Sequence, residues 1–187
     1  MTLFDRAICF AVERHSGQTR KLSQAPYILH PLEAAAIVGT MTEDEEVLAA
    51  AVLHDTIEDT DTMPEEISAA FGKRVMALVY CETEDKRDNL PPEATWRVRK
   101  EETLAILHNT KDISVKMMWL GDKLSNVRSL ARQYDSVGNK LWDSFHQKDP
   151  VEQEWYYRSI INGLSELKDY PAYREFVMLV DKIFSEV

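Results

Sequence analysis

The fold class is indicated most clearly by residues 43–59, which read EDEEVLAAAVLHDTIED. Apolar residues recur there at the spacing of one face of an α-helix, so the pattern predicts a helix over the whole stretch. At the same spacing this face continues into His54, Asp55 and Glu58. Such a continuation is unusual, because burying ionisable groups without partners is energetically costly.

The charges around this stretch make the burial of these ionisable groups still more unfavourable. No Lys or Arg lies between Lys21 and Lys73, yet 11 of the chain's 32 acidic residues do. Asp55, Glu58 and Asp59 fall in the last turns of the predicted helix, where the helix dipole is already negative. No basic residue is near them in the sequence, so a bound cation would compensate both the burial and the dipole.

A second helical pattern, over residues 113–134, also places polar side chains on a face that should be apolar. Asp122 and Asn126 lie on the face that its apolar residues mark as core. His30 directly precedes Pro31, which suits the first position of another helix. Helices could therefore bring two imidazoles and two carboxylates together, from His30, His54, Asp55 and Asp122. This mixed set suits Mn²⁺, Fe²⁺, Co²⁺ or Zn²⁺, whereas structural zinc prefers thiolates.

Taken alone, each of these residues has a structural explanation. A histidine before a proline is more often a capped or core residue, and an isolated aspartate on an apolar face usually bonds to a helix end. The joint pattern favours a metal site, because every member lies on a helix face that should be apolar. The chain contains no phosphate-binding glycine loop and no nucleophile elbow that would indicate other chemistry.

Helical spacing dominates the rest of the chain, and strand alternation is scarcely visible. With 187 residues, 44% of them hydrophobic, the length predicts a single domain over residues 1–187. The expected fold class is all-α, a bundle of about eight to ten helices. Six glycines and seven prolines are too few for a turn-rich β-sandwich or barrel.

Charge and composition also predict where the protein acts. The net charge of −10 disfavours binding to nucleic acid. No apolar run is long enough for a bilayer, and the first residues do not resemble a signal peptide. Two lone cysteines indicate a reducing compartment, so we expect a cytoplasmic protein with no membrane partner. The sequence does not indicate whether the protein forms an oligomer.

These residues resemble the HD superfamily of metal-dependent phosphohydrolases, named for its adjacent His-Asp ligands. More narrowly, the chain is similar to the hydrolase domain of the RelA/SpoT alarmone family. Four blocks match in the family's order: RKLSQAPYILHPLEAA (20–35), AAAVLHDTIEDTD (49–61), FGKRVMALV (71–79) and VKMMWLGDKLSNVRSL (115–130). No synthetase domain is expected, so the resemblance is to stand-alone small alarmone hydrolases of the metazoan SpoT type.

The resemblance implies a reaction and a set of residue roles. The family removes the 3′-diphosphate of guanosine 3′,5′-bis(diphosphate) or its 5′-triphosphate form, giving pyrophosphate and GDP or GTP. One Mn²⁺ would be bound by His30, His54, Asp55 and Asp122. Glu58 and Asp59 would position or deprotonate the attacking water. The small nucleotide substrate would be met by Arg20, Lys21 and Asn126. Because the acidic segment would repel such a polyanion, we also expect Lys100 to help attract it to the site.

Two departures from the family's pattern bear on these roles. Gln24–Ala25 replaces the glycine that is common before the Pro-Tyr pair, which affects the shape of the loop that meets the base. Lys123 and Ser125 replace a frequent Arg and His, which leaves the metal ligands unchanged but alters the contacts around them.

Two alternatives remain open. The chain could be another HD enzyme: a nucleotidase, a cyclic-nucleotide phosphodiesterase, or a hydrolase of adenosine alarmones or of the 2′-phosphate of NADPH. It could instead be a catalytically inactive module that binds alarmones, but such a module is expected to lose a metal ligand or the Glu58–Asp59 pair. Both acids are present, and the identity of the base stays open.

Overall fold

The computed structural model describes residues 1–21, 23–87 and 89–185, and its regular elements are helices. This described part contains ten α-helices and two short 3₁₀ helices, which confirms the predicted all-α class. The elements are α1 (Leu3–Arg14), α2 (Leu29–Val38), α3 (Glu45–Leu53), α4 (Thr56–Asp59), α5 (Pro64–Phe71), α6 (Lys73–Tyr80), α7 (Pro92–Asn109), α8 (Ile113–Val137), η1 (Gly138–Ser144), α9 (Pro150–Gly163), η2 (Ser165–Leu167) and α10 (Pro171–Ile183).

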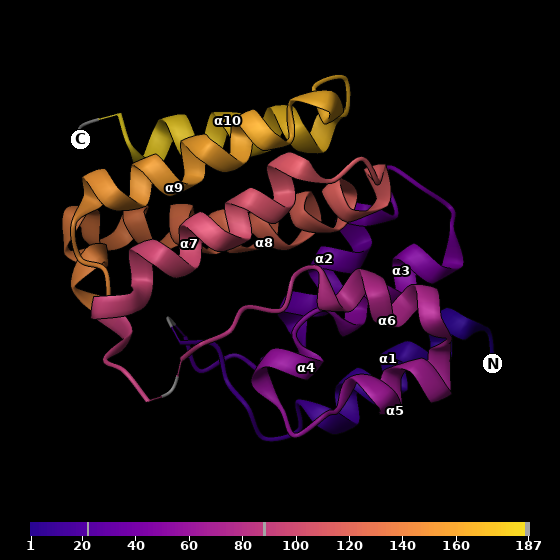
Figure 1. The fold of residues 1–187 in the computed structure, drawn as a ribbon. Helices are drawn as coiled ribbons and strands as arrows, with labels where there is room; N and C mark the ends of the chain where they lie inside the picture. The colour runs from indigo at the N-terminus through magenta and orange to yellow at the C-terminus, as the bar shows by residue number, and fades with distance from the viewer. Residues whose placement is uncertain (22, 88, 186–187) are drawn as a thin grey trace.

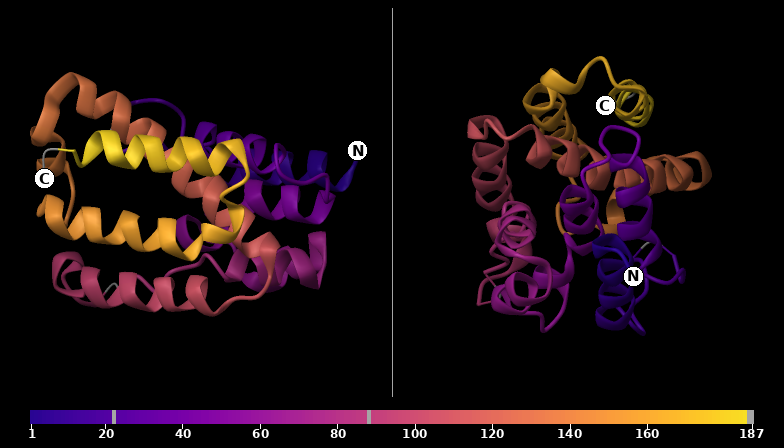
Figure 2. Two further views of the ribbon diagram at one scale, coloured as in Figure 1. Left: turned by 90° about the horizontal axis from the view of Figure 1, so that it is seen from above. Right: turned by 90° about the vertical axis from the view of Figure 1, so that its right-hand side faces the viewer.

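The helices form two groups that meet along α8 (Figure 1). The first group, α1 to α6, packs mainly through α1 on α3, α2 on α3 and α5 on α6. In the second group, α7, α9 and α10 lie alongside one another, and α10 covers α8 (Figure 2). The long α8 also packs closely on α2, so the two groups share one core around Trp119 and Leu53.

The approach of α2 to α8 is unusually close at Gly121. A β-carbon added there would lie 2.6 Å from Val38 Cγ2 and 2.8 Å from the carbonyl oxygen of Ala34. Both distances are shorter than real contacts of this kind, so a side chain at this position would have to move one helix. The missing side chain thus brings the start of α2, which carries His30, close to Asp122 of α8.

The prediction of one continuous helix over residues 43–59 is wrong. Helix α3 ends at Leu53, His54 and Asp55 form a turn, and α4 follows. At Asp55 the backbone angles (φ −90°, ψ −5°) depart from those of a regular helix, and the Thr56 hydroxyl donates to the carbonyl of Leu53 at 2.6 Å. Adjacent side chains on a regular helix point about 100° apart. The turn therefore allows the neighbouring His54 and Asp55 to face one point.

Other boundaries differ less. The second helix begins at Leu29, so Pro31 lies within its first turn instead of at its first position. Helical spacing predicts one helix over residues 151–167, but α9 ends at Gly163 and is followed by the 3₁₀ helix η2. Among the described residues, no helix combines the length and the apolar character needed to cross a lipid bilayer.

Candidate active site

The four predicted metal ligands lie together where α2, the turn after α3 and α8 meet. The Nε2 atoms of His30 and His54 are 3.2 Å apart, and Asp122 Oδ1 is 3.1 Å from His30 Nε2. Asp55 Oδ2 is 3.1 Å from His54 Nε2 and 3.4 Å from His30 Nε2. His30, His54 and Asp122 are almost fully buried. Residues far apart in sequence thus present two nitrogen and two oxygen donors to one point.

The donor set fits a divalent metal ion. His54 Nδ1 is 2.8 Å from the carbonyl oxygen of Ala51, which can only accept, so Nδ1 carries the proton and Nε2 offers its lone pair. His54 Nε2 faces His30 Nε2 and the carboxylates of Asp55 and Asp122. Burial disfavours a charged imidazole, yet Asp55 and Asp122 outweigh it and raise the pKa of His54. The site therefore stabilises positive charge at the point where the donors converge.

Tyr27 links a predicted ligand to a predicted catalytic acid. Its hydroxyl oxygen is 2.7 Å from Asp55 Oδ2 and 2.8 Å from Asp59 Oδ2, and its proton can bond to either. Burial and the two carboxylates raise the pKa of Tyr27 above its usual range, so the hydroxyl stays a donor. No periodicity connects residue 27 with residues 55 and 59, so this contact could not be predicted from the sequence.

Glu58 and Asp59 lie beside the donor set and are held by the segment that follows α6. The backbone N–H of Glu84 donates to Glu58 Oε2 at 3.1 Å. The Lys86 ammonium is 3.6 Å from Glu58 Oε1 and hydrogen-bonds Asp59. Burial, followed by the charge of Asp55, raises the pKa of Glu58 to about 7. Glu58 can therefore exchange a proton near neutral pH, and Lys86 supplies the cation that is absent from the neighbouring sequence.

Two further ionisable residues, Lys123 and Glu82, also lie at this site. Lys123 hydrogen-bonds Asp122, and its ammonium lies 5.0 Å from the centre of the Trp119 ring. Both carboxylate oxygens of Glu82 are buried, and within the described part of the chain they have no hydrogen-bond partner. Burial and the charge of Asp122 raise the pKa of Glu82 to about 8. The sequence marked Lys123 only as a departure from the family's usual arginine, and no sequence pattern pointed to Glu82.

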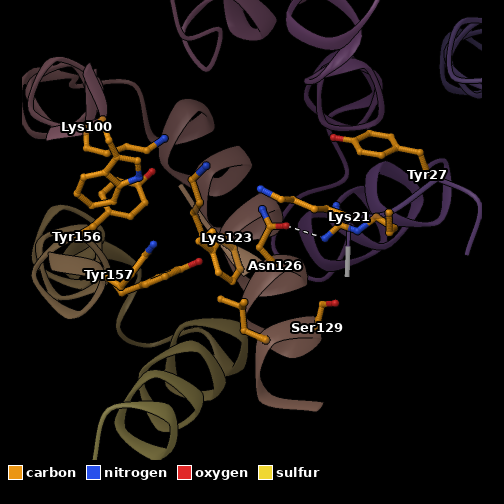
Figure 3. Close-up of a pocket in the computed structure, with 13 residues that line it drawn as sticks. Lys21, Tyr27, Lys100, Lys123, Asn126, Ser129, Tyr156 and Tyr157 are labelled. Atoms are coloured by element: carbon orange, nitrogen blue, oxygen red, sulfur yellow. Dashed lines mark hydrogen bonds between the residues drawn. The ribbon is translucent and has the colours of Figure 1, made fainter. Parts of the chain in front are cut away.

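The donor set opens into two adjoining chambers. The smaller, of about 190 Å³, is lined by the four predicted ligands and by Glu58 and Asp59. The larger, of about 360 Å³, lies between α7, α8 and α9 and the loop before α2 (Figure 3). The two chambers have six lining residues in common: Arg20, Tyr27, Lys100, Lys123, Asn126 and Tyr156. A single ligand could thus occupy both.

All four predicted substrate residues line the larger chamber. The Arg20 guanidinium donates to Asn126 Oδ1 at 2.8 Å, and the Asn126 amide donates to Asp122 Oδ1 at 2.6 Å. Lys21 lies 5.6 Å from the centre of the Phe145 ring. On the opposite wall, the Lys100 ammonium lies 5.2 Å from the centre of the Tyr156 ring (Figure 3). Cations and aromatic rings therefore alternate around this chamber.

A comparison with protein families identifies this arrangement. Residues 7–150 match the model described as "HD domain". The chain belongs to the HD domain family. The match includes every donor of the site described above, and it ends at the first residue of α9.

Relatives of this HD domain carry informative names. It is 42% identical over 125 residues to the guanosine-3′,5′-bis(diphosphate) 3′-pyrophosphohydrolase of Aquifex aeolicus, covering 67% of this chain but 17% of that protein. It is 40% identical over 126 residues to the Danio rerio guanosine-3′,5′-bis(diphosphate) 3′-pyrophosphohydrolase MESH1, covering 66% of each chain. The chain thus spans about a sixth of the first relative and about two thirds of the second.

Solved structures agree with the fold of this HD domain. The crystal structure of lmo0812 from Listeria monocytogenes EGD-e has a TM-score of 0.73 and 32% identity, covering 84% of this chain and 99% of that one. A metazoan ortholog of SpoT, whose structure is described as that of a protein that hydrolyses ppGpp, has a TM-score of 0.74 and 26% identity. That likeness covers 100% of this chain and 96% of the other, so it includes α9 and α10.

Proposed function

We propose that this HD domain removes the 3′-diphosphate of guanosine 3′,5′-bis(diphosphate) or its 5′-triphosphate form, giving pyrophosphate and GDP or GTP. The observation that carries the proposal is the pair of joined chambers, one rich in metal donors and carboxylates, the other lined by cations and aromatic rings. The first suits a reacting phosphate, and the second suits the remainder of a charged nucleotide. The names of the Aquifex and zebrafish relatives support the same substrate.

We assign one divalent transition-metal ion to His30, His54, Asp55 and Asp122, because mixed imidazole and carboxylate donors suit such ions, and we name it Mn²⁺ because the family resemblance implies this ion. A divalent ion held there draws charge from the phosphate oxygens and lowers the pKa of bound water towards neutrality. The residues of the chain orient the substrate and handle the protons. We propose that a single domain, residues 1–187, carries this complete site.

In the reaction, one water is added across the bond between the ribose 3′-oxygen and its phosphorus. The water oxygen attacks phosphorus, that bond breaks, and the 3′-oxygen takes up a proton. Glu58 accepts the proton of the attacking water, a role that its pKa near neutrality suits. Asp59, held by Tyr27 and Lys86, lies where it can order the water and relay a proton.

The cations of the larger chamber offset the charge of the substrate. Such a polyanion would be repelled by a protein of net charge −10 unless positive groups were concentrated at the site. Arg20, Lys21, Lys100 and Lys123 provide this concentration. Arg20 lies 5.6 Å over the Tyr27 ring at the junction of the chambers, so it can contact the phosphates and stack on a base.

The proposal is tested by supplying metal-loaded protein with a panel of phosphate esters. We expect release of pyrophosphate from guanosine 3′,5′-bis(diphosphate) with the largest kcat/KM. The panel includes the adenosine analogue, NADPH, cyclic nucleotides and nucleoside monophosphates, which represent the alternative HD activities. A larger kcat/KM for any of these would replace the proposed substrate, and metal-dependent binding of guanosine tetraphosphate without turnover would indicate an inactive binding module.

Arg20→Ala should raise KM for guanosine tetraphosphate about tenfold or more, because a charge-assisted contact to phosphate contributes about 1.5–3 kcal/mol. Activity on p-nitrophenyl phosphate, which is too small to fill the second chamber, should be nearly unchanged. Arg132→Ala is the matched control, because this exposed arginine of α8 lies outside both chambers. Equal losses on the two substrates would show that Arg20 supports the metal site and does not bind the nucleotide.

A further inference from the structure

A chain of hydrogen bonds runs from the metal donor His30 to the last helix, α10. His30 Nδ1 is 2.9 Å from the Ser125 hydroxyl oxygen, and this hydroxyl donates to Glu33 Oε2 at 2.8 Å. The other oxygen of Glu33 accepts from the Arg128 guanidinium at 3.1 Å. Arg128 also donates to both carboxylate oxygens of Glu175 on α10, each at 2.7 Å.

The direction of these bonds fixes the proton on His30. The Ser125 hydroxyl has one proton, and the Glu33 carboxylate can only accept, so the proton of Ser125 points to Glu33. The oxygen of Ser125 must then accept from His30 Nδ1–H. The lone pair of the neutral imidazole is consequently on Nε2, the atom that faces His54 and Asp122.

At the His30 end of this chain of hydrogen bonds, burial makes the contact with Ser125 difficult to replace. His30 is 4% exposed and Ser125 is 2% exposed, so water has little access as a substitute partner for Nδ1. At the outer end the side chains of Arg128 and Glu175 are about one third exposed. An isolated ion pair at such a position contributes little. Here, however, the planar guanidinium contacts Glu33 and Glu175 together, and it thereby restricts the orientation of Glu33.

We propose that Ser125, Glu33, Arg128 and Glu175 form a positioning network that holds His30 in its metal-binding tautomer and makes α10 a functional part of the metal centre. The inference rests on the proposed metal site. It concerns a helix that lies beyond residue 150, where the match to the HD domain model ends. None of the four residues touches the donor point itself, so they act through His30.

The inner half of the network is tested with Ser125→Ala. Outer partners of metal-bound histidines typically contribute 10–100-fold to metal affinity, so Mn²⁺ should bind about 10-fold to 100-fold more weakly. In the metal-free protein, ¹⁵N NMR of His30 should show the single Nδ1–H tautomer in the parent and a mixture in the variant. Ser136→Ala, on the exposed face of the same helix, should change neither quantity. Unchanged affinity and tautomer in Ser125→Ala would overturn the proposal.

The outer half is tested with Glu175→Gln against Asp181→Asn. Both residues are on α10 and both pair with an arginine, but the partner of Asp181 is Arg158 of α9, outside the network. We expect a several-fold weaker Mn²⁺ affinity for Glu175→Gln and none of this loss for Asp181→Asn. Equal effects would mean that α10 contributes only general stability, which contradicts the proposal.

These measurements also separate this inference from the proposed function. Metal affinity and the His30 tautomer do not depend on which nucleotide is hydrolysed, so the network can be confirmed even if guanosine tetraphosphate is not the substrate. Conversely, a parent protein that hydrolyses guanosine tetraphosphate, with variants that all bind Mn²⁺ normally, would retain the function and refute the network.

Discussion

His54→Ala should remove both the bound divalent metal and the hydrolytic activity. His54 Nε2 is within 3.2 Å of donor atoms of both His30 and Asp55, so its loss removes a central donor of the set. The remaining carboxylates would be left buried with less compensation. We expect metal content to fall from one ion per chain to near zero by elemental analysis, while helical circular dichroism stays largely intact.

The matched control for this substitution is His146→Ala. His146 is exposed and lies outside both chambers, so the variant removes an imidazole without removing a donor. Metal content and activity should equal those of the parent. Full metal content in His54→Ala would refute the assignment of this residue as a ligand, and loss of metal in both variants would point to an indirect effect.

Glu58→Gln should lower kcat by roughly 10²–10⁴-fold and leave the metal content unchanged, because that range is typical of a lost general base. The amide keeps the shape of the side chain and can still accept from the N–H of Glu84, but it cannot take a proton from water. Glu65→Gln, an exposed acid at the start of α5, controls for the change in charge. Loss of metal would make Glu58 a ligand, and normal turnover would remove it from the mechanism.

The pH profile gives a second signature of the same residue. A general base acts in its ionised form, and burial beside Asp55 raises the pKa of Glu58 to about 7. Activity should therefore decrease as the pH falls through about 7, well above the usual range of a glutamate. This acidic limb should disappear in the residual activity of Glu58→Gln. A limb that persists unchanged in the variant would belong to another group.

The candidate metal donors could be picked out from the sequence because ionisable residues there interrupt apolar helical patterns. His54, Asp55 and Asp122 occupy positions that helical periodicity assigns to the core, and such positions do not take ionisable groups without compensation. The same periodicity predicted the all-α class. Helical spacing also predicts a helix over residues 93–108, and α7 extends one residue further at each end.

The periodicity failed where the backbone of the candidate site is irregular. The stretch 43–59 has an unbroken helical pattern, yet His54 and Asp55 form a turn between α3 and α4. Nothing in the spacing of side chains reports a local bend of this kind. The Thr56 hydroxyl, which bonds the Leu53 carbonyl, helps to make the turn, but threonines within helices often bond in this way without ending them.

The contacts around the donors were not predictable, because they join residues far apart in sequence. Lys86 reaches Asp59 from the segment after α6, and Tyr27 reaches it from the loop before α2. Ser125 could be recognised as a departure from the family's usual histidine, but only the structure shows that its hydroxyl lies between His30 and Glu33. Side-chain partners of this kind depend on how helices are placed relative to one another.

The close contact at Gly121 determines how far apart His30 and Asp122 lie. His30 and Asp122 are carried by opposite helices, so the spacing between α2 and α8 is also the span that a cation must bridge. A methyl group at position 121 would lie 2.8 Å from the carbonyl oxygen of Ala34, so these two helices would have to move apart. Metal–ligand bond lengths tolerate errors of only about 0.2 Å. A residue with no functional group of its own thus determines whether the nitrogen of one helix and the oxygen of the other can hold the same ion.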